Sequence, residues 1–392
     1  MGFFARKARA RTLLGVLAFV LGLGTVPHRW CESDGEGFFE GNARVVDSLA
    51  ARVANTTERR IAPTTFATGS GLFDEEWQFG TFMMAAMGFG QTAMARPEGS
   101  ASRRLNVARL ETCLDALLSK ESRNFDRQSW KDDPLDSLHV VPGSSRDRGH
   151  VAYLGYAGLA LGLHRMLVPN SRFADVHDAV ARALDRRFVA ARQGFLETYP
   201  GEIYPVDNAA GLGAIALFAR ATHRSLPAGF KHGMDAIRMR GVDASSGLLF
   251  QAFGLDGRPK DDARGSGTAL AAYFLSFADA PTSTALYGAV RAELFRTVLG
   301  FGAVLEHSDA AARSDIDSGP VVLGFGVSAT GFALGASRVH ADRDAFLALY
   351  ATANLFGAPF EEDGERRFAT GGPLGDAILF AMLTAPPVGA FS

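Results

Sequence analysis

The chain has 392 residues, with 40 basic and 42 acidic side chains and only two cysteines. A chain of this length can bury a large core without a disulfide or a structural metal. Because acids and bases nearly balance and are interleaved beyond the N-terminus, the composition argues against a nucleic-acid-binding protein. Cys31 and Cys113 belong to no CxxC pair or Cys/His cluster, which argues against a zinc site and leaves a single Cys31–Cys113 bridge as the one conceivable disulfide.

The N-terminus has the order of an export signal. A basic stretch, ARKARAR at residues 5–11, precedes the apolar run TLLGVLAFVLGLGTV at residues 12–26. The run is short for a bilayer span and no clear cleavage site follows, so residues 1–30 are predicted to be either a cleaved signal or a signal anchor that tethers the protein to the membrane. In both cases the bulk of the chain is expected in the periplasm or otherwise outside the cytoplasm. An amphipathic cytoplasmic helix is disfavoured because the run is apolar all round.

Beyond residue 40, apolar residues recur at the three- and four-residue spacing of helices, and strand-like alternation is confined to short pieces such as residues 247–253. Twelve helical segments are predicted, at about 41–59, 74–95, 103–120, 149–168, 171–192, 208–224, 228–240, 264–279, 282–303, 319–338, 343–356 and 374–385. An even number near twelve favours a single all-α domain over residues 31–392, built as an (α/α) toroid in which inner and outer helices alternate around a ring. An open helical solenoid is the alternative, but it would show a more regular repeat.

Acidic clusters stand directly before three of these helices, in YPVDN, RPKDDARGSG and RSDIDSGP. Asp207, Asp262 and Asp317 could each cap the helix that follows, which is the structural interpretation. Each cluster nevertheless carries more polar groups than one cap needs. If the three helices belong to the inner ring, their N-termini face one opening, and the three aspartates are candidate catalytic residues there.

The stretch GFLETYPGEIYPVDN at residues 194–208 is the densest of these clusters. It holds Glu197, Tyr199, Glu202, Tyr204 and Asp207 among two prolines and a glycine. We expect Glu202 and Asp207 to transfer protons, and Glu197, Tyr199 and Tyr204 to bind or orient a substrate. Paired carboxylates flanked by aromatic rings are what glycosidic bond cleavage requires.

Other candidate substrate-binding residues lie outside this stretch. Glu76 and Trp77 stand near the start of a Met- and Phe-rich helix, where acids are also favoured by the helix dipole. His150 and Tyr153 are three residues apart and can share one helix face, although a lone histidine is more often structural. Arg264 completes the second acidic cluster.

The segments GHVAYLGYAGLALGLHRML, GFLETYPGEIYPVDNAAGLGAIALF and GLLFQAFGLDGRPKDDARGSGTAL, in this order, resemble the linalool dehydratase/isomerase family, over about residues 73–383. The resemblance implies an (α/α) barrel, often a homo-oligomer, that is exported in its best-known member, needs no cofactor and adds or removes water at an alcohol. It also implies an acidic and aromatic site lining, here Glu76, Trp77, His150, Tyr199 and Tyr204. The family's catalytic cysteines are replaced by Glu197 and Asp207, so the same chemistry by the same residues is not expected.

Three functions remain open on the sequence. The first is an exported acid–base enzyme acting on glycans, the second a hydro-lyase or isomerase acting on a small hydroxylated substrate, and the third a non-catalytic envelope protein whose acids only cap helices. A polar funnel would favour the first, and a closed apolar chamber the second. Histidines are scattered and no glycine-rich phosphate loop follows a strand, so no metal or organic cofactor is expected.

Overall fold

The computed structural model describes residues 26–59, 61–144, 147–309 and 319–390, together with a few single positions between 12 and 22. The helices are α2 (Gly35–Glu40), α3 (Ala43–Glu58), α4 (Gly71–Ala95), α5 (Ala101–Leu117), α6 (Asn124–Trp130), α7 (Val151–Leu167), α8 (Ala174–Ala190), α9 (Pro205–Ala221), α10 (Ala228–Ala236), α11 (Gly265–Leu275), α12 (Ala280–Ala289), α13 (Val327–Val339), α14 (Arg343–Gly357) and α15 (Gly372–Leu383). The strands form four antiparallel hairpins, β1 (Phe250–Phe253) with β2 (Pro259–Ala263), β3 (Phe295–Val298) with β4 (Phe301–Val304), β5 (Val321–Val322) with β6 (Phe325–Gly326), and β7 (Pro359–Glu362) with β8 (Glu365–Phe368).

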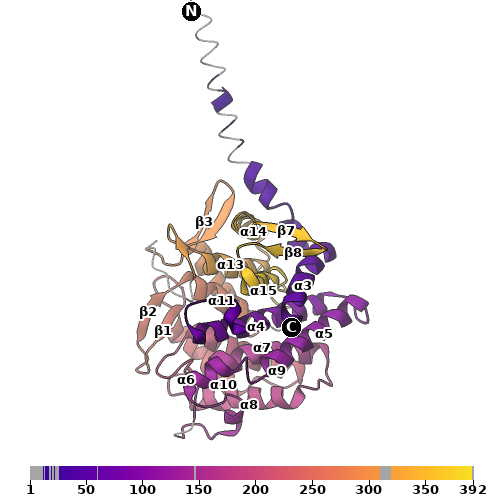
Figure 1. Cartoon of the computed structure of the whole chain (residues 1–392). Coiled ribbons are helices and arrows are strands. Elements are labelled where there is room, and N and C mark those ends of the chain that lie inside the picture. The colour runs from indigo at the N-terminus through magenta and orange to yellow at the C-terminus, as the bar shows by residue number, and fades with distance from the viewer. Residues whose placement is uncertain are drawn as a thin grey trace, which may run out of the picture.

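Six helices form a closed inner ring (Figure 1). α4 packs against α7, α7 against α9, α9 against α11, α11 against α13, α13 against α15, and α15 returns to α4. The outer layer consists of α3, α5, α8, α10, α12 and α14, each packed against the inner helix next to it in the chain. The predicted all-α fold and the (α/α) toroid are therefore confirmed.

The two ends of the ring differ in the length of their connections. Each inner helix from α4 to α13 passes to the next outer helix through a short turn, such as residues 168–173 or 340–342. Each outer helix passes to the next inner helix through a long segment, and all four β-hairpins lie in these segments. The N-termini of the inner helices therefore share one end of the ring with the hairpins, and any site built from loops belongs at that end.

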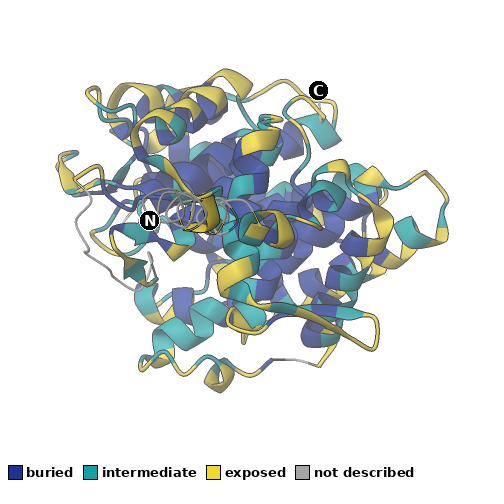
Figure 2. Cartoon of the chain, turned by 90° about the horizontal axis from the view of Figure 1, so that it is seen from above, coloured by how far each residue is buried: buried dark blue, intermediate teal, exposed yellow. Residues whose placement is uncertain are grey.

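The inner helices are buried on nearly every side, which explains why their sequences are rich in alanine and glycine (Figure 2). On α7, Gly155, Gly158 and Gly162 face α9, and a Cβ atom on any of them would lie 2.6–2.8 Å from the nearest atom of α9. Small residues at this spacing let two helices approach closely along their length. They set the α7–α9 distance and bring the first turns of both helices together.

Contacts between the first and last helices close the ring. Arg52 on α3 forms an ion pair of 2.9 Å with the buried carboxylate of Asp376 on α15. The buried amide of Gln91 on α4 donates to the Ala381 carbonyl at 2.9 Å and accepts from the Tyr273 hydroxyl of α11 at 2.8 Å. These bonds satisfy polar groups that would be costly to bury alone.

Two of the twelve predicted segments are partly wrong. Residues 295–303 of the predicted helix 282–303 belong to the β3–β4 hairpin, and the predicted helix 319–338 begins only at Val327, after the β5–β6 hairpin. The turns Leu299–Gly300 and Leu323–Gly324 both have positive φ angles, which no helix accommodates. α6 and the β7–β8 hairpin were not predicted at all.

The prediction for residues 12–26 lies largely outside the described residues. No helix among the described residues is long and apolar enough to cross a membrane. The conceivable Cys31–Cys113 bridge does not form, since both cysteines are free and buried. Burial raises the pKa of the Cys113 thiol to about 12.

His177 on α8 is buried, and its burial is expected to make the folded protein less stable in acid. Its ring is 1% exposed, packs edge-on against Phe218, and has no hydrogen-bond partner on either nitrogen among the described residues. Burial, with smaller contributions from the Arg165 and His164 charges, lowers its pKa to about 3. In the unfolded chain the His177 ring takes up a proton near pH 6.5, whereas in the folded chain it does so only near pH 3. The contribution of His177 to the free energy of unfolding is therefore complete above pH 6.5 and is lost as the pH falls toward 3. Between pH 7.5 and pH 5 the loss is about 2 kcal/mol.

The measurement is urea unfolding at both pH values for the wild type and for His177→Phe, whose ring cannot be protonated. The variant is expected to lose about 2 kcal/mol less than the wild type on acidification. Equal losses in the two proteins would show that His177 does not carry the effect.

Candidate active site

Asp207 lies at the shared end of the inner ring, as the third residue of α9. Tyr204 occupies the N-cap position and makes no capping bond with its side chain, so the structural interpretation of Asp207 as an N-cap is wrong. The carboxylate is 9% exposed and accepts a 2.7 Å hydrogen bond from the hydroxyl of Tyr156 on α7. Its place in the first turn also puts it near the positive end of the helix dipole, which stabilises a negative charge.

A second carboxylate and phenol pair lies beside the first. The Tyr199 hydroxyl, in the loop before α9, donates a 2.7 Å hydrogen bond to Oε1 of Glu76 on α4. The pKa of Tyr199, a half-buried residue, is raised well above its usual value, first by burial and then by the charges of Glu76, Asp207 and Asp126. Tyr199 therefore keeps its proton at neutral pH, and Glu76 and Asp207 act on the same phenol.

Asn208 holds the loop that carries Tyr199. Its fully buried side-chain amide accepts from the Leu196 amide nitrogen at 2.8 Å and donates to the carbonyls of Leu196 and Tyr204, at 3.0 Å each. The Thr198 hydroxyl also accepts a 3.1 Å hydrogen bond from the Tyr204 amide nitrogen. The loop is thus fixed at both ends, as a preorganised site requires.

Glu202 lies at the rim of the site and is partly exposed. It forms a 2.7 Å ion pair with Lys260 on β2 and accepts a 3.2 Å hydrogen bond from the Tyr204 hydroxyl. The pair links the loop before α9 to the β1–β2 hairpin. A partly exposed carboxylate paired with a lysine is typical of an ion pair on the protein surface, whereas a group that transfers protons is usually more buried.

Glu202→Gln is accordingly expected to lower turnover by less than about fivefold, because a surface ion pair contributes at most about 1 kcal/mol. Lys260→Gln should have the same small effect. Steady-state assays of both variants would test this, and a far larger loss of turnover in Glu202→Gln alone would support the predicted catalytic role of Glu202.

Of the other two predicted catalytic aspartates, the structure describes only Asp262. Asp262 is exposed on β2, and the helix α11 begins three residues later with Arg264 at its N-cap, so Asp262 does not cap it. Asp317 lies outside the described residues. The buried Arg264 donates a short hydrogen bond to Asp261, and this pair fixes the end of the hairpin before α11.

His150 belongs to a buried pair. Its Nδ1 lies 2.5 Å from Asp126 of α6, both side chains are fully buried, and the residue has a positive φ of 51° at the N-cap of α7. Burial is the largest cause of a raised pKa at Asp126, which the hydrogen bond to His150 partly offsets. Asp126 also contributes to the pKa of Tyr199, so the pair lies behind the site.

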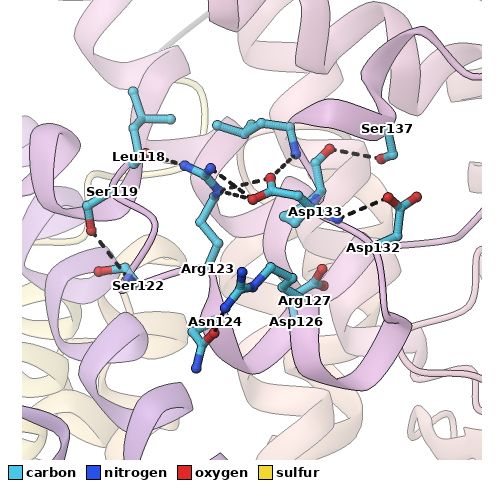
Figure 3. A network of polar contacts seen from close by, with 12 residues as sticks. Leu118, Ser119, Ser122, Arg123, Asn124, Asp126, Arg127, Asp132, Asp133 and Ser137 are labelled. Atoms are coloured by element: carbon cyan, nitrogen blue, oxygen red, sulfur yellow. Dashed lines mark hydrogen bonds and ion pairs between the residues drawn. The ribbon is translucent and has the colours of Figure 1, made fainter.

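The segment that carries Asp126 is anchored by Arg123 (Figure 3). Arg123 donates to both carboxylate oxygens of Asp133, at 2.9–3.1 Å, and to the Leu118 carbonyl at 2.6 Å. These bonds hold the pKa of Asp133 below its usual value against the opposing effect of burial, which is the largest single contribution.

The remaining predicted residues have structural contacts. Tyr153, predicted to bind substrate, is fully buried in the core and donates a 2.9 Å bond to the Leu117 carbonyl. Glu197 accepts from the Gly201 amide nitrogen at 2.8 Å and stabilises the turn that precedes Glu202. Trp77 packs edge-on against Phe66, with part of its ring accessible at the same end of the fold.

Two further groups at this end were not selected from the sequence. Tyr156 lies on α7, and nothing in the sequence pairs it with Asp207. Glu306 is fully buried and accepts a 2.6 Å bond from the Ser266 hydroxyl in α11. A Cβ at Gly326 would lie 2.3 Å from Glu306, so only glycine fits there.

Among the described residues no group of three or more histidine, cysteine, aspartate or glutamate side chains could hold a metal ion. No family model matches the chain, and no curated protein matches it. The resemblance to the linalool dehydratase/isomerase family therefore stays an interpretation of the sequence.

Two solved structures have a backbone fold similar to that of this chain. A GH76 α-mannanase of Bacteroides thetaiotaomicron is 10% identical, with a TM-score of 0.47, and the match covers 78% of this chain and 84% of the mannanase. A family 76 glycoside hydrolase (mannosidase) of Bacteroides thetaiotaomicron VPI-5482 is 8% identical, with a TM-score of 0.43, covering 79% and 86% of the two chains. At this distance the likeness adds nothing to what the ring of helices already establishes about the fold.

Proposed function

We propose that the protein is an exported acid–base enzyme that acts on glycans, cleaving or modifying a glycosidic bond. The observation that supports this best is the cluster of Glu76, Tyr199, Asp207 and Tyr156. Two carboxylates, each hydrogen-bonded by a tyrosine hydroxyl at 2.7 Å, come from α4 and α9 and influence one phenol. Each carboxylate accepts a hydrogen bond from a phenol that keeps its proton, so a proton acceptor and a proton donor lie side by side.

In this proposal Asp207 stays ionised, because the Tyr156 hydroxyl and the start of α9 both stabilise its negative charge. It acts as the base or nucleophile. Tyr199, which its raised pKa keeps protonated, gives its phenolic proton to the leaving oxygen as that oxygen becomes an alkoxide, and the phenolate takes a proton back from water before the next turnover, while Glu76 orients the phenol. Product stereochemistry then depends on the separation of the two carboxylates across the substrate.

The polar rim favours a glycan over a small terpenoid alcohol. Glu202, Lys260 and Tyr204 form a charged and hydrogen-bonding border beside the cluster, and Trp77 offers a partly exposed ring at the same end of the fold. A sugar offers many hydroxyls to such groups, whereas an apolar alcohol would require a dry chamber.

The test is to incubate the purified full chain with a panel of oligosaccharides and, separately, of tertiary alcohols. Products are followed by mass spectrometry, with the anomeric configuration of any released sugar determined by NMR. The proposal predicts a new reducing end from at least one glycan and no dehydration of the alcohols. Dehydration or isomerisation of an alcohol without any glycan product would favour the hydro-lyase alternative and overturn the proposal.

A further inference from the structure

A cavity lies beside the loop that carries Tyr199. It has a volume of about 830 Å³ and lies between Gly143, residues 147–149, the C-terminal end of α8, residues 191–197 and the turn of the β1–β2 hairpin. Gln193 closes one wall, where its side chain packs against Gly257 and donates to the Leu255 carbonyl at 3.4 Å. This volume lies in the range of sites for small organic ligands.

The floor of the cavity holds a buried guanidinium with an unused donor. Arg187 of α8 is 4% exposed; its Nη2 donates to the carbonyl and hydroxyl of Ser137, at 3.0 and 2.9 Å, and its Nε bonds Asp147 at 3.3 Å. Nη1 has no hydrogen-bond partner among the described residues. A buried, charged N–H group without an acceptor is costly, and an anionic oxygen in the cavity would remove that cost.

The carboxylates of the lining are already engaged by the protein. Asp147 accepts from Arg187 and from the Gly143 amide nitrogen at 2.9 Å, Glu197 accepts from the Gly201 amide nitrogen at 2.8 Å, and Asp256 accepts from the Arg258 amide nitrogen at 3.0 Å. These bonds fix loop and turn backbone. A hydrogen bond from a neutral amide leaves a carboxylate its charge, so among these acids only Asp147, which is paired with Arg187, has its charge offset by a lining arginine.

The basic side chains of the lining outnumber these acids. Arg148, Arg192 and Arg240 join Arg187, so four arginines face three carboxylates in a chain whose formal net charge is −2. Arg192 and Arg240 are exposed at the mouth, and Arg240 places its Nη1 on the Gln193 carbonyl at 3.2 Å. A local excess of arginine in a negatively charged protein marks a place for an anion.

We propose that this cavity binds a small ligand that carries an oxyanion group, a carboxylate, phosphate or sulfate, with Arg187 at its floor and Arg192 and Arg240 at its mouth. The site is separate from the Glu76–Asp207 cluster but shares the loop at residues 193–203 with it. It does not depend on the proposed catalysis, because binding requires no reaction. Asp207→Asn should therefore bind the anion as the wild type does.

Isothermal titration of the full chain at constant ionic strength tests the site with inorganic phosphate, D-glucuronate and neutral D-glucose. The double variant Arg192→Gln/Arg240→Gln removes two exposed charges without disturbing the buried Arg187. The matched control is Arg104→Gln/Arg224→Gln, which removes two exposed arginines beside the short turns at the other end of the ring. Thermal unfolding of all three proteins checks that they are folded.

The expected result is binding of phosphate, glucuronate or both, a Kd at least tenfold higher in the cavity variant, and a change of less than about twofold in the control. Phosphate alone would indicate a phosphate ester as the ligand, and glucuronate alone an acidic sugar. The proposal is wrong if neither anion binds below about 10 mM, if glucose binds as well as glucuronate, or if both double variants weaken binding equally.

Discussion

Asp207→Asn is expected to lower turnover by about 10²–10⁴ while the protein stays folded, since this is the usual contribution of a positioned acid or base. Asn keeps the size of the side chain and can still accept from the Tyr156 hydroxyl, so the change removes the titrating group and little else. Steady-state kinetics on the glycan found to react would show the loss in kcat more than in KM, because the group acts in the transition state.

The matched control is Asp115→Asn, an exposed carboxylate of α5 that pairs with Arg172 at 2.6 Å on the outer surface. It should retain activity. The turnover of Tyr156→Phe should lie between those of Asp207→Asn and Asp115→Asn, because this change removes the hydrogen-bond donor to Asp207 and leaves the Asp207 carboxylate in place. Wild-type turnover in Asp207→Asn would exclude Asp207 from the chemistry and return it to a role in the first turn of α9.

Asn208→Asp is expected to destabilise the fold by about 2–4 kcal/mol, the cost of leaving buried polar groups unpaired. The new carboxylate can still accept from the Leu196 amide nitrogen. It cannot donate to the Leu196 and Tyr204 carbonyls, which the Asn208 amide now satisfies at 3.0 Å each. Because the residue is fully buried, the added charge has no solvent to stabilise it.

Denaturant unfolding at neutral pH would measure this loss, with the exposed Asn170→Asp as the control expected to change stability by less than about 0.5 kcal/mol. Acidification should restore part of the stability of Asn208→Asp, because a protonated carboxyl regains one donor. Equal stability of the two variants would show that the amide does not hold the loop before α9.

The helices of this fold could be predicted from the sequence, because an inner helix is apolar on all sides and an outer helix on one side, and both patterns can be recognised within a single segment. The β-hairpins were harder to predict. Residues 295–303 carry apolar residues that suit either period, and only the positive φ angles at Leu299 and Gly300 decide for a turn. For the β7–β8 hairpin a signal did exist, since Asp363–Gly364 is a dipeptide typical of tight hairpin turns.

The candidate site was predictable only in part, for a related reason. Asp207 and Tyr199 stand in one acidic loop and were selected from the sequence, and Glu76 was selected at the start of its helix. Their partnership was not, because Glu76 and Tyr199 are 123 positions apart in the chain. Tyr156 was missed for the same reason, since only the packing of α7 against α9 brings it to Asp207, and Glu306 likewise meets Ser266 from 40 positions away.

The closure of the ring also sets the order in which the chain can fold. Arg52 must find Asp376, 324 positions later, and Gln91 must find Ala381, 290 positions later. α15 can pack against α4 only after it has left the ribosome or, in an exported chain, after it has been translocated. Until then the apolar side chains on that side of α4 are exposed and can make non-native contacts. Such distant contacts slow folding because a long loop must close before they form. The newly made chain should therefore depend on a holding chaperone until its last residues arrive.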